Sequence, residues 1–437
     1  MNRRLRKGGG MEKIKRVKID KERTWVFSPV SNIAFKVDIG GRISQEQLKK
    51  AIKNTIQQYE MFHQKIVLDE SGIAYYEETN VLNPTIRPMN LEWSEVIKEQ
   101  EKIPLRIDQG ELIRFFYSQK EECMSLLIVA HHIAGDGMSF IYFLQDILRS
   151  LAGRKIEYKK LQLFDMDALP KKTKLQAPTT WLKKHMNKQW SRTGRKFDFE
   201  EYYQMYKQCW KNRETLVYTY QLKEENYDLL YQYAKANQVT INTLLTTALI
   251  KVSGELCDVG MAASIREKDF TGMGNYATGI SIKYKYKEKY DFLWNAKMVQ
   301  KRIYSKLNNT SKKYFLLQFM RNIEPTLIDA VYFNACGNYE NKIAKTFSKM
   351  FGYDGNPKGI SITNLTQLPI ESKYNDIELK DLIFIPPIVL NAKRIIGVAS
   401  LGKNMRLSLH INNDENVGVN SDFFYKAMEF LTNEIGK

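Results

Sequence analysis

The chain has 437 residues, 43% of them hydrophobic and 12% aromatic, which is enough for two hydrophobic cores and excludes a disordered protein. Lys and Arg number 67 against 49 Asp and Glu, so the net charge is +18 at pH 7, which attracts anions of every kind without naming one. No apolar run approaches the length that crosses a bilayer, and no zinc-finger, RNA-binding or basic-zipper motif supports nucleic-acid binding.

The cysteines and the N-terminus bear on where the protein works. None of the four cysteines is in a Cys-x-x-Cys pair or near histidine at metal-ligand spacing, which predicts free thiols in a reduced cytoplasm. Residues 1–10 are basic and end in three glycines, with no hydrophobic segment behind them. We therefore expect a flexible extension or tag there, not a secretory signal.

The first predicted elements are a strand and a helix. Residues 32–39 (NIAFKVDI) alternate like a strand. Ser44 and Gln47 have the spacing of a capping box, and apolar side chains recur at helical intervals from Leu48 to Tyr59.

A buried strand and a second helix flank the most unusual segment of the chain. Residues 123–131 (CMSLLIVAH) form a continuous apolar run, which is typical of a strand buried on both faces. Residues 138–153 have helical periodicity and end in glycine. The segment HHIAGDGMS, residues 131–139, is therefore predicted to be the loop between them.

The middle of the chain, residues 163–212, is predicted to be a linker with helices. It contains two prolines and a basic stretch, residues 171–196, without Asp or Glu. A solvated helix face is the simplest interpretation. A docking surface for an acidic carrier protein is the alternative.

The second half resumes with a strand at residues 215–222 and a buried helix that Thr240 is expected to cap. Near its end, residues 405–431 repeat the strand–loop–helix order of residues 124–148. His410 falls on that strand, and Asn412, Asn413 and Asp414 fall in the loop. The echo predicts two related halves, of which only the first carries the His-His-Asp-Gly arrangement.

The His-His-Asp-Gly loop is open to three interpretations. Neighbouring strand side chains point to opposite faces, so His131 and His132 do not converge on one metal ion with Asp136, and we predict no metal site. Histidine at a strand end is also often purely structural. The third interpretation is general-base catalysis by a neutral imidazole, with the Gly137 N–H near a developing oxyanion and the acceptor itself as nucleophile.

The segment HHIAGDG resembles the His-His-x-x-x-Asp-Gly motif of the chloramphenicol-acetyltransferase-like superfamily. Its members include nonribosomal-peptide condensation domains, alcohol acetyltransferases, plant BAHD acyltransferases and wax-ester synthases. Four further segments resemble the family in the same order: residues 104–117, 237–249, 264–284 and 361–369. The Asp-Phe-Gly-Trp-Gly motif of the plant enzymes is missing, which disfavours that branch.

The resemblance implies an α/β fold of two chloramphenicol-acetyltransferase-like lobes, a V-shaped pseudo-dimer with a central tunnel. The expected division is a first lobe at residues 11–162, the linker at 163–212 and a second lobe at 213–437. His132 is expected to be the general base, with Asp136 and Gly137 as further catalytic residues. His131 and Arg266 would support the site, Arg266 by pairing with Asp136 across the lobes. Weaker substrate-binding candidates are Ser139, which we favour as a helix-start residue, Asn275 and Asn364.

The implied activity is acyl transfer from a thioester, on coenzyme A or an acidic carrier protein, to a hydroxyl or amine of a small molecule. The acyl thioester is a co-substrate, so no bound cofactor is expected. The length leaves no room for adenylation or carrier domains, so we expect a free-standing, cytoplasmic monomer without a nucleic-acid partner. The alternative is a condensation-like recruitment protein that has lost the reaction.

Overall fold

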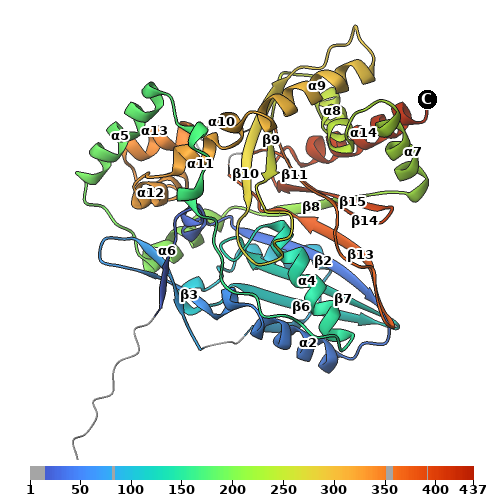
Figure 1. Cartoon of the computed structure of the whole chain (residues 1–437), viewed down its shortest axis with the longest axis horizontal. Helices are drawn as coiled ribbons and strands as arrows, with labels where there is room; N and C mark the ends of the chain where they lie inside the picture. The colour runs from blue at the N-terminus through green and yellow to red at the C-terminus, as the bar shows by residue number, and fades with distance from the viewer. Residues whose placement is uncertain (1–14, 81–83, 351–357, 391) are drawn as a thin grey trace, which may run out of the picture.

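The computed structural model describes residues 15–80, 84–350, 358–390 and 392–437, so the predicted extension at residues 1–10 lies outside the described residues. Two six-stranded sheets, each with its own helices, form two lobes (Figure 1). Within the described ranges, no helix is long and apolar enough to span a bilayer. None of the four cysteines forms a disulfide, as the sequence predicted.

The first sheet contains the strands predicted at residues 32–39 and 123–131. Its strand order is β12 (Lys373–Tyr374), β13 (Ile377–Ile385), β2 (Asn32–Gly40), β7 (Cys123–His131), β6 (Ile113–Lys120) and β5 (Thr85–Pro88). Its helices are α2 (Gln45–Gln57), α3 (Trp93–Glu101) and α4 (Gly137–Leu151). The capping box of Ser44 and Gln47 is present at the start of α2.

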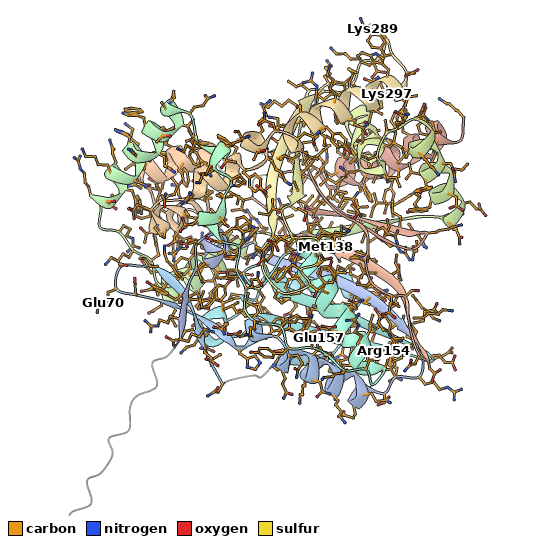
Figure 2. The ribbon with its side chains drawn as sticks, in the orientation of Figure 1. Glu70, Met138, Arg154, Glu157, Lys289 and Lys297 are labelled. Atoms are coloured by element: carbon orange, nitrogen blue, oxygen red, sulfur yellow. The ribbon has the colours of Figure 1, made fainter. Side chains whose placement is uncertain are left out.

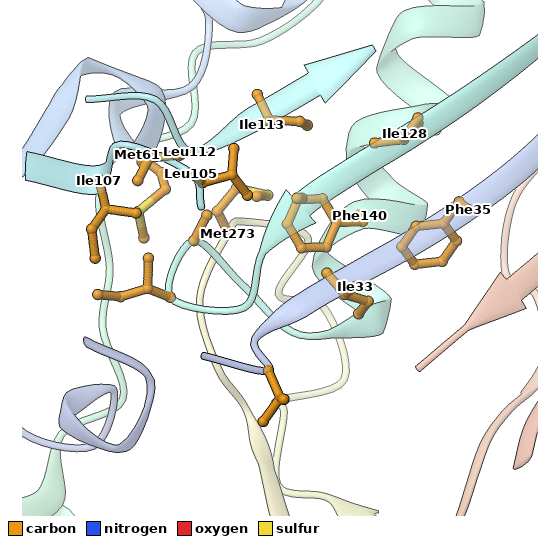
Figure 3. Packing of buried hydrophobic residues seen from close by; sticks show 14 of the residues in the cluster. Ile33, Phe35, Met61, Leu105, Ile107, Leu112, Ile113, Ile128, Phe140 and Met273 are labelled. Atoms are coloured by element: carbon orange, nitrogen blue, oxygen red, sulfur yellow. The ribbon is translucent and has the colours of Figure 1, made fainter. Parts of the chain in front are cut away.

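The core of this lobe lies between the sheet and its helices. Ile33 and Phe35 of β2 and Ile128 of β7 pack with Phe140 of α4 (Figure 3). The rings of Phe35 and Phe140 are 6.0 Å apart between centroids. Met273, from the second half of the chain, is also buried in this core. The lobe is therefore completed by a residue far away in sequence.

The second sheet is built from the later strands. Its order is β10 (Ala277–Tyr284), β9 (Cys257–Ser264), β11 (Ile360–Gln367), β14 (Ile395–Leu401), β15 (Asn404–Asn412) and β8 (Thr215–Leu222). The helices beside it are α7 (Glu224–Ala236), α8 (Ile241–Ser253), α9 (Phe292–Leu307) and α14 (Val417–Ile435). Thr240 caps α8 through its side chain, as predicted.

The two sheets repeat one arrangement, which confirms the two related halves that the repeated strand–loop–helix order predicted. In the first, the hairpin β6–β7 leads into α4, β2 pairs with β7, and β5 runs parallel to β6. In the second, the hairpin β14–β15 leads into α14, β8 pairs with β15, and β11 runs parallel to β14. His410 of β15 is buried, and its Nε2 lies 3.0 Å from the carboxylate of Glu101. The pseudo-dimer is thus a property of the fold.

A third group of elements joins the lobes. The small sheet has the order β1 (Arg16–Lys18), β4 (Ala74–Glu78) and β3 (Gln64–Leu68). Short helices are α1 (Arg23–Val26), η1 (Glu60–His63), η2 (Ile107–Gln109), η3 (Met166–Ala168) and η4 (Lys171–Thr173). The others are α5 (Ala177–Ser191), α6 (Phe199–Trp210), α10 (Thr310–Lys313), α11 (Phe315–Met320), α12 (Pro325–Ala335) and α13 (Lys342–Met350). In Figure 1, α5, α11, α12 and α13 lie together at the left.

The chain returns to the first lobe after building most of the second. Strand β13 pairs antiparallel with β2, with Ile385 opposite Ala34 and Leu379 opposite Ile39. This pairing covers an edge of β2 that would otherwise expose unpaired backbone groups. The sequence-based division at residues 162 and 212 stays a prediction, but the strand at 377–385 belongs to the first sheet and not to the second.

Candidate active site

The HHIAGDGMS segment lies at the junction of β7 and α4, as its flanking patterns predicted. Asp136 is the N-cap of α4, and its Oδ1 accepts a hydrogen bond from the backbone N–H of Ser139 at 2.9 Å. This bond satisfies one of the free N–H groups at the helix start. Met138, one residue into the helix, lies where the two lobes meet (Figure 2). The loop is thus held at the contact between the lobes.

His131 points into the protein and is 1% exposed. Its Nδ1 accepts a hydrogen bond from the N–H of Ile133 at 3.2 Å, so the proton belongs on Nε2, which lies 2.7 Å from the hydroxyl of Ser31. That hydroxyl in turn donates to the carbonyl of Ser28 at 3.2 Å. Burial lowers the pKa of His131 to about 3. A neutral ring with a hydrogen bond at each of its nitrogens fits the supporting role expected for His131.

His132 points the other way and lines a cavity of about 1540 Å³. Its ring stacks on the indole of Trp25, with centroids 4.0 Å apart and planes 5° apart. Among the described residues, no group hydrogen-bonds its Nδ1, which is buried. Burial lowers the pKa of His132 against the opposing effects of its own carbonyl and the Asp136 carboxylate. The imidazole is therefore neutral near pH 7 and able to accept a proton.

Asp136 forms the central contact between the lobes. Arg266 donates from Nη2 to Asp136 Oδ1 at 2.8 Å, with side-chain exposures of 6% and 10%. The N–H of Tyr276 donates to Oδ2 at 2.7 Å. Burial opposes ionisation, but the Arg266 guanidinium and the N–H groups outweigh it, so the pKa of Asp136 lies below its usual value. Arg266 thus occupies the place that the resemblance implied.

The loop between β9 and β10 binds the first-lobe loop through its backbone. The Gly274 carbonyl accepts from the Asp136 N–H at 3.2 Å and from the Ser139 hydroxyl at 2.7 Å. Gly274 has φ of +146°, a conformation that favours glycine. The Asn275 side chain donates from Nδ2 to the His132 carbonyl at 2.9 Å. The second lobe therefore holds the backbone of His132 in place.

Three sequence candidates do not line the cavity: Ser139, which the sequence favoured as a helix-start residue, Asn364 and Gly137. Ser139 contacts Asp136, Arg266 and Gly274, so it starts the helix and joins the lobes. Asn364 lies on β11 and donates to the Asn242 side chain at 3.3 Å, and it does not line the cavity. Gly137 packs against Leu365 and Phe384 and does not line the cavity either.

Sequence reasoning missed the residues that position His132 from the N-terminal segment. Trp25 lies on α1, which is only four residues long and has no periodicity to detect. An ion pair between Arg23 and Asp329 of α12, with side-chain exposures of 2% and 1%, anchors this helix. The Tyr332 hydroxyl also donates to the Thr24 carbonyl at 2.6 Å. The contacting residues of α1 and α12 are about 300 positions apart in the chain, so no local sequence pattern predicts their contact.

Gly137→Ala is expected to destabilise the protein by about 1 kcal/mol. A Cβ there would come within 2.7 Å of Leu365 Cδ2. Overpacking costs about 1–3 kcal/mol, and the better helix propensity of alanine returns about 1 kcal/mol. Urea unfolding measures the difference. Gly418→Ala, in the first turn of α14 with no atom within 4 Å of the new Cβ, is the control and should not destabilise. Equal effects of the two changes would contradict the packing argument.

The described part of the chain contains no group of three or more His, Cys, Asp or Glu side chains that could hold a metal ion.

In sequence, no family model and no curated protein matches the chain. Its fold matches polyketide synthase associated protein 5 from Mycobacterium tuberculosis, with a TM-score of 0.64 and 12% identity over 96% of this chain and 98% of that one. It also matches the first condensation domain of the calcium-dependent antibiotic synthetase, with 0.64 and 10% over 97% of both.

A third match is trichothecene 15-O-acetyltransferase from Fusarium sporotrichioides, with a TM-score of 0.63 and 11% identity over 96% of this chain and 95% of that one. At such identities the likeness concerns the fold. The chain therefore has the two-lobed fold shared by condensation domains and chloramphenicol-acetyltransferase-like enzymes, which the motif predicted.

Proposed function

We propose that the protein is an acyltransferase, which moves an acyl group from a thioester to a hydroxyl or amine of a small molecule, with His132 as general base. One observation carries the proposal: His132 is a neutral imidazole on the wall of a large cavity, held by a stacked ring and by a loop from the other lobe. The shared fold supports it, because one neighbour is an acetyltransferase and another a condensation domain.

In the proposed reaction His132 removes the proton from the acceptor hydroxyl or amine as this attacks the thioester carbonyl. The resulting tetrahedral oxyanion collapses, the carbon–sulfur bond breaks, and the imidazolium returns the proton to the departing thiolate. The products are an ester or amide and a free thiol. Asp136 and Arg266 take no proton in this scheme. They hold the loop so that the His132 ring stays oriented.

The donor is proposed to be coenzyme A or an acidic carrier protein. Basic side chains outnumber acidic ones among the residues that line the cavity, which favours anionic partners. Lys174, within the basic stretch 171–196, lies on the cavity wall. Docking of a carrier protein there would weaken steeply with salt concentration.

A thiol-release assay tests the proposal. Purified protein is mixed with acyl-coenzyme A donors of increasing chain length, or with an acyl carrier protein, and with mixed alcohol and amine acceptors. We expect release of free thiol that depends on the acceptor, and an acylated product by mass spectrometry. If neither donor class releases thiol with any acceptor, acyl transfer is contradicted and a recruitment role gains weight.

The pH profile of kcat/KM should have an acidic limb below pH 6.5. A general base works unprotonated, and the pKa of His132 lies below its ordinary value because the ring is buried. Activity is then kept as the pH falls from 7 and is lost only as it passes through the lowered pKa. The Asn275 amide acts to raise this pKa, so Asn275→Ala should move the limb further down. A limb at or above pH 6.5 would argue against His132 as the base.

A further inference from the structure

A second charged side chain lies on the cavity wall near His132. Lys21 precedes α1, and its side chain is partly buried and lines the cavity. Its Nζ donates a short hydrogen bond to the backbone carbonyl of Asn275 and lies 5.4 Å from the centre of the Phe164 ring. Asn275 is the residue whose side chain binds the His132 carbonyl. A single residue thus connects the lysine to the proposed base.

Lys21 has no carboxylate partner within ion-pair distance among the described residues, whereas its neighbours are paired. Lys18 lies 2.7 Å from Asp20, and Arg23 pairs with Asp329. Of the acidic groups that act on its charge, Asp136 is bound by Arg266, and burial raises the pKa of Glu22, which precedes α1 beside Lys21. The cavity wall therefore carries a cationic side chain that has no ion-pair partner among the described residues.

A partly buried cation without an ion-pair partner is stabilised by an anion that reaches it. We propose that Lys21 forms an anion subsite inside the cavity, which binds a carboxylate carried by the acyl chain or by the acceptor. This inference rests on the proposed function for the identity of the molecule that carries the carboxylate. The existence of the anion subsite does not depend on the proposed function.

The charge state of Lys21 fits this role. Burial lowers its pKa to about 8, with Glu22 and Asp136 acting to raise it and Arg266 to lower it. The side chain is therefore mostly protonated at pH 7 and loses its charge above pH 8. His132 is the other titratable group near it, and the pKa of His132 is lowered in part by Lys21. Anion binding should accordingly weaken as the pH rises through 8.

The first test measures binding without turnover. Sodium butyrate and butyramide share a carbon skeleton and differ in charge. At about ten times its Kd, butyrate should raise Tm by about 2 °C, and butyramide should not. Lys21→Met should abolish the shift and Lys21→Arg should keep it. Lys18→Met is the matched control, since Lys18 lines the same cavity but is paired. An equal shift in Lys21→Met, or none in the wild type, overturns the subsite.

The second test identifies which substrate carries the carboxylate. Succinyl-coenzyme A is compared with butyryl-coenzyme A as donor, and 4-hydroxybutyrate with 4-hydroxybutyramide as acceptor. For the pair that uses the subsite, Lys21→Met should raise KM, and so lower kcat/KM, at least about tenfold more for the charged member than for the neutral member. Equal losses for both members would mean that Lys21 acts on structure or on chemistry instead.

The two proposals fail in different ways. Without thiol release from any donor, the acyltransferase proposal falls, while the Tm comparison of butyrate and butyramide still decides the subsite. With thiol release but no discrimination between charged and neutral substrates, the anion subsite falls and the acyltransferase proposal stands.

Discussion

His132→Ala should lower kcat of acyl transfer by about a thousandfold and leave the free energy of unfolding within about 1.5 kcal/mol of the wild type. The large loss is expected because no other imidazole among the described residues lines the cavity. The small stability change is expected because the ring's main described contact is its stack on Trp25. Thiol release measures the first quantity and urea unfolding the second.

His131→Ala is the matched control and should show the opposite pattern in stability. Its ring bonds the Ser31 hydroxyl and the Ile133 N–H in a fully buried place. Truncation leaves the Ile133 N–H unpaired, removes one of the two partners of the Ser31 hydroxyl and opens a void, which should together cost about 3 kcal/mol. A His132→Ala enzyme that keeps its turnover would rule out the general-base role. A His132→Ala protein that unfolds like His131→Ala would make the ring structural.

Asp136→Asn should destabilise the protein by about 3–5 kcal/mol, because it leaves the Arg266 guanidinium buried without its counter-ion. The change keeps the size of the side chain and removes its charge. The carboxylate also accepts from the backbone N–H groups of Ser139 and Tyr276, and an amide with one oxygen cannot replace both acceptors. Because these bonds join the lobes, kcat should fall as well.

The control for this change is a fully exposed ion pair. Arg42 and Glu122 lie 3.3 Å apart with side-chain exposures of 90% and 72%, so Glu122→Gln should change the unfolding free energy by less than about 0.5 kcal/mol. Urea unfolding compares the two variants. If Asp136→Asn is no more harmful than Glu122→Gln, the contact between Asp136 and Arg266 does not hold the lobes together.

Local pattern alone determined the part of the site on β7 and α4. A continuous apolar run specifies a buried strand, and helical periodicity after Asp136 specifies a helix that its carboxylate caps, since both depend on residues a few positions apart. The alternation of side chains along a strand also separated His131 from His132. The repeat of strand, loop and helix near residue 410 predicted two related sheets for the same reason.

Tertiary structure alone decided what surrounds His132. Trp25 and Asn275 contact His132 from segments more than 100 residues away, because α1 is anchored on α12 and the β9–β10 loop docks on α4. Lys21, just before α1, contacts Asn275 in turn. Strand β13 likewise joins β2 across more than 300 residues, and Asn364 turns toward Asn242 and not to the cavity. Such contacts depend on how completed sheets and helices pack, and this leaves no periodicity in the sequence of either partner.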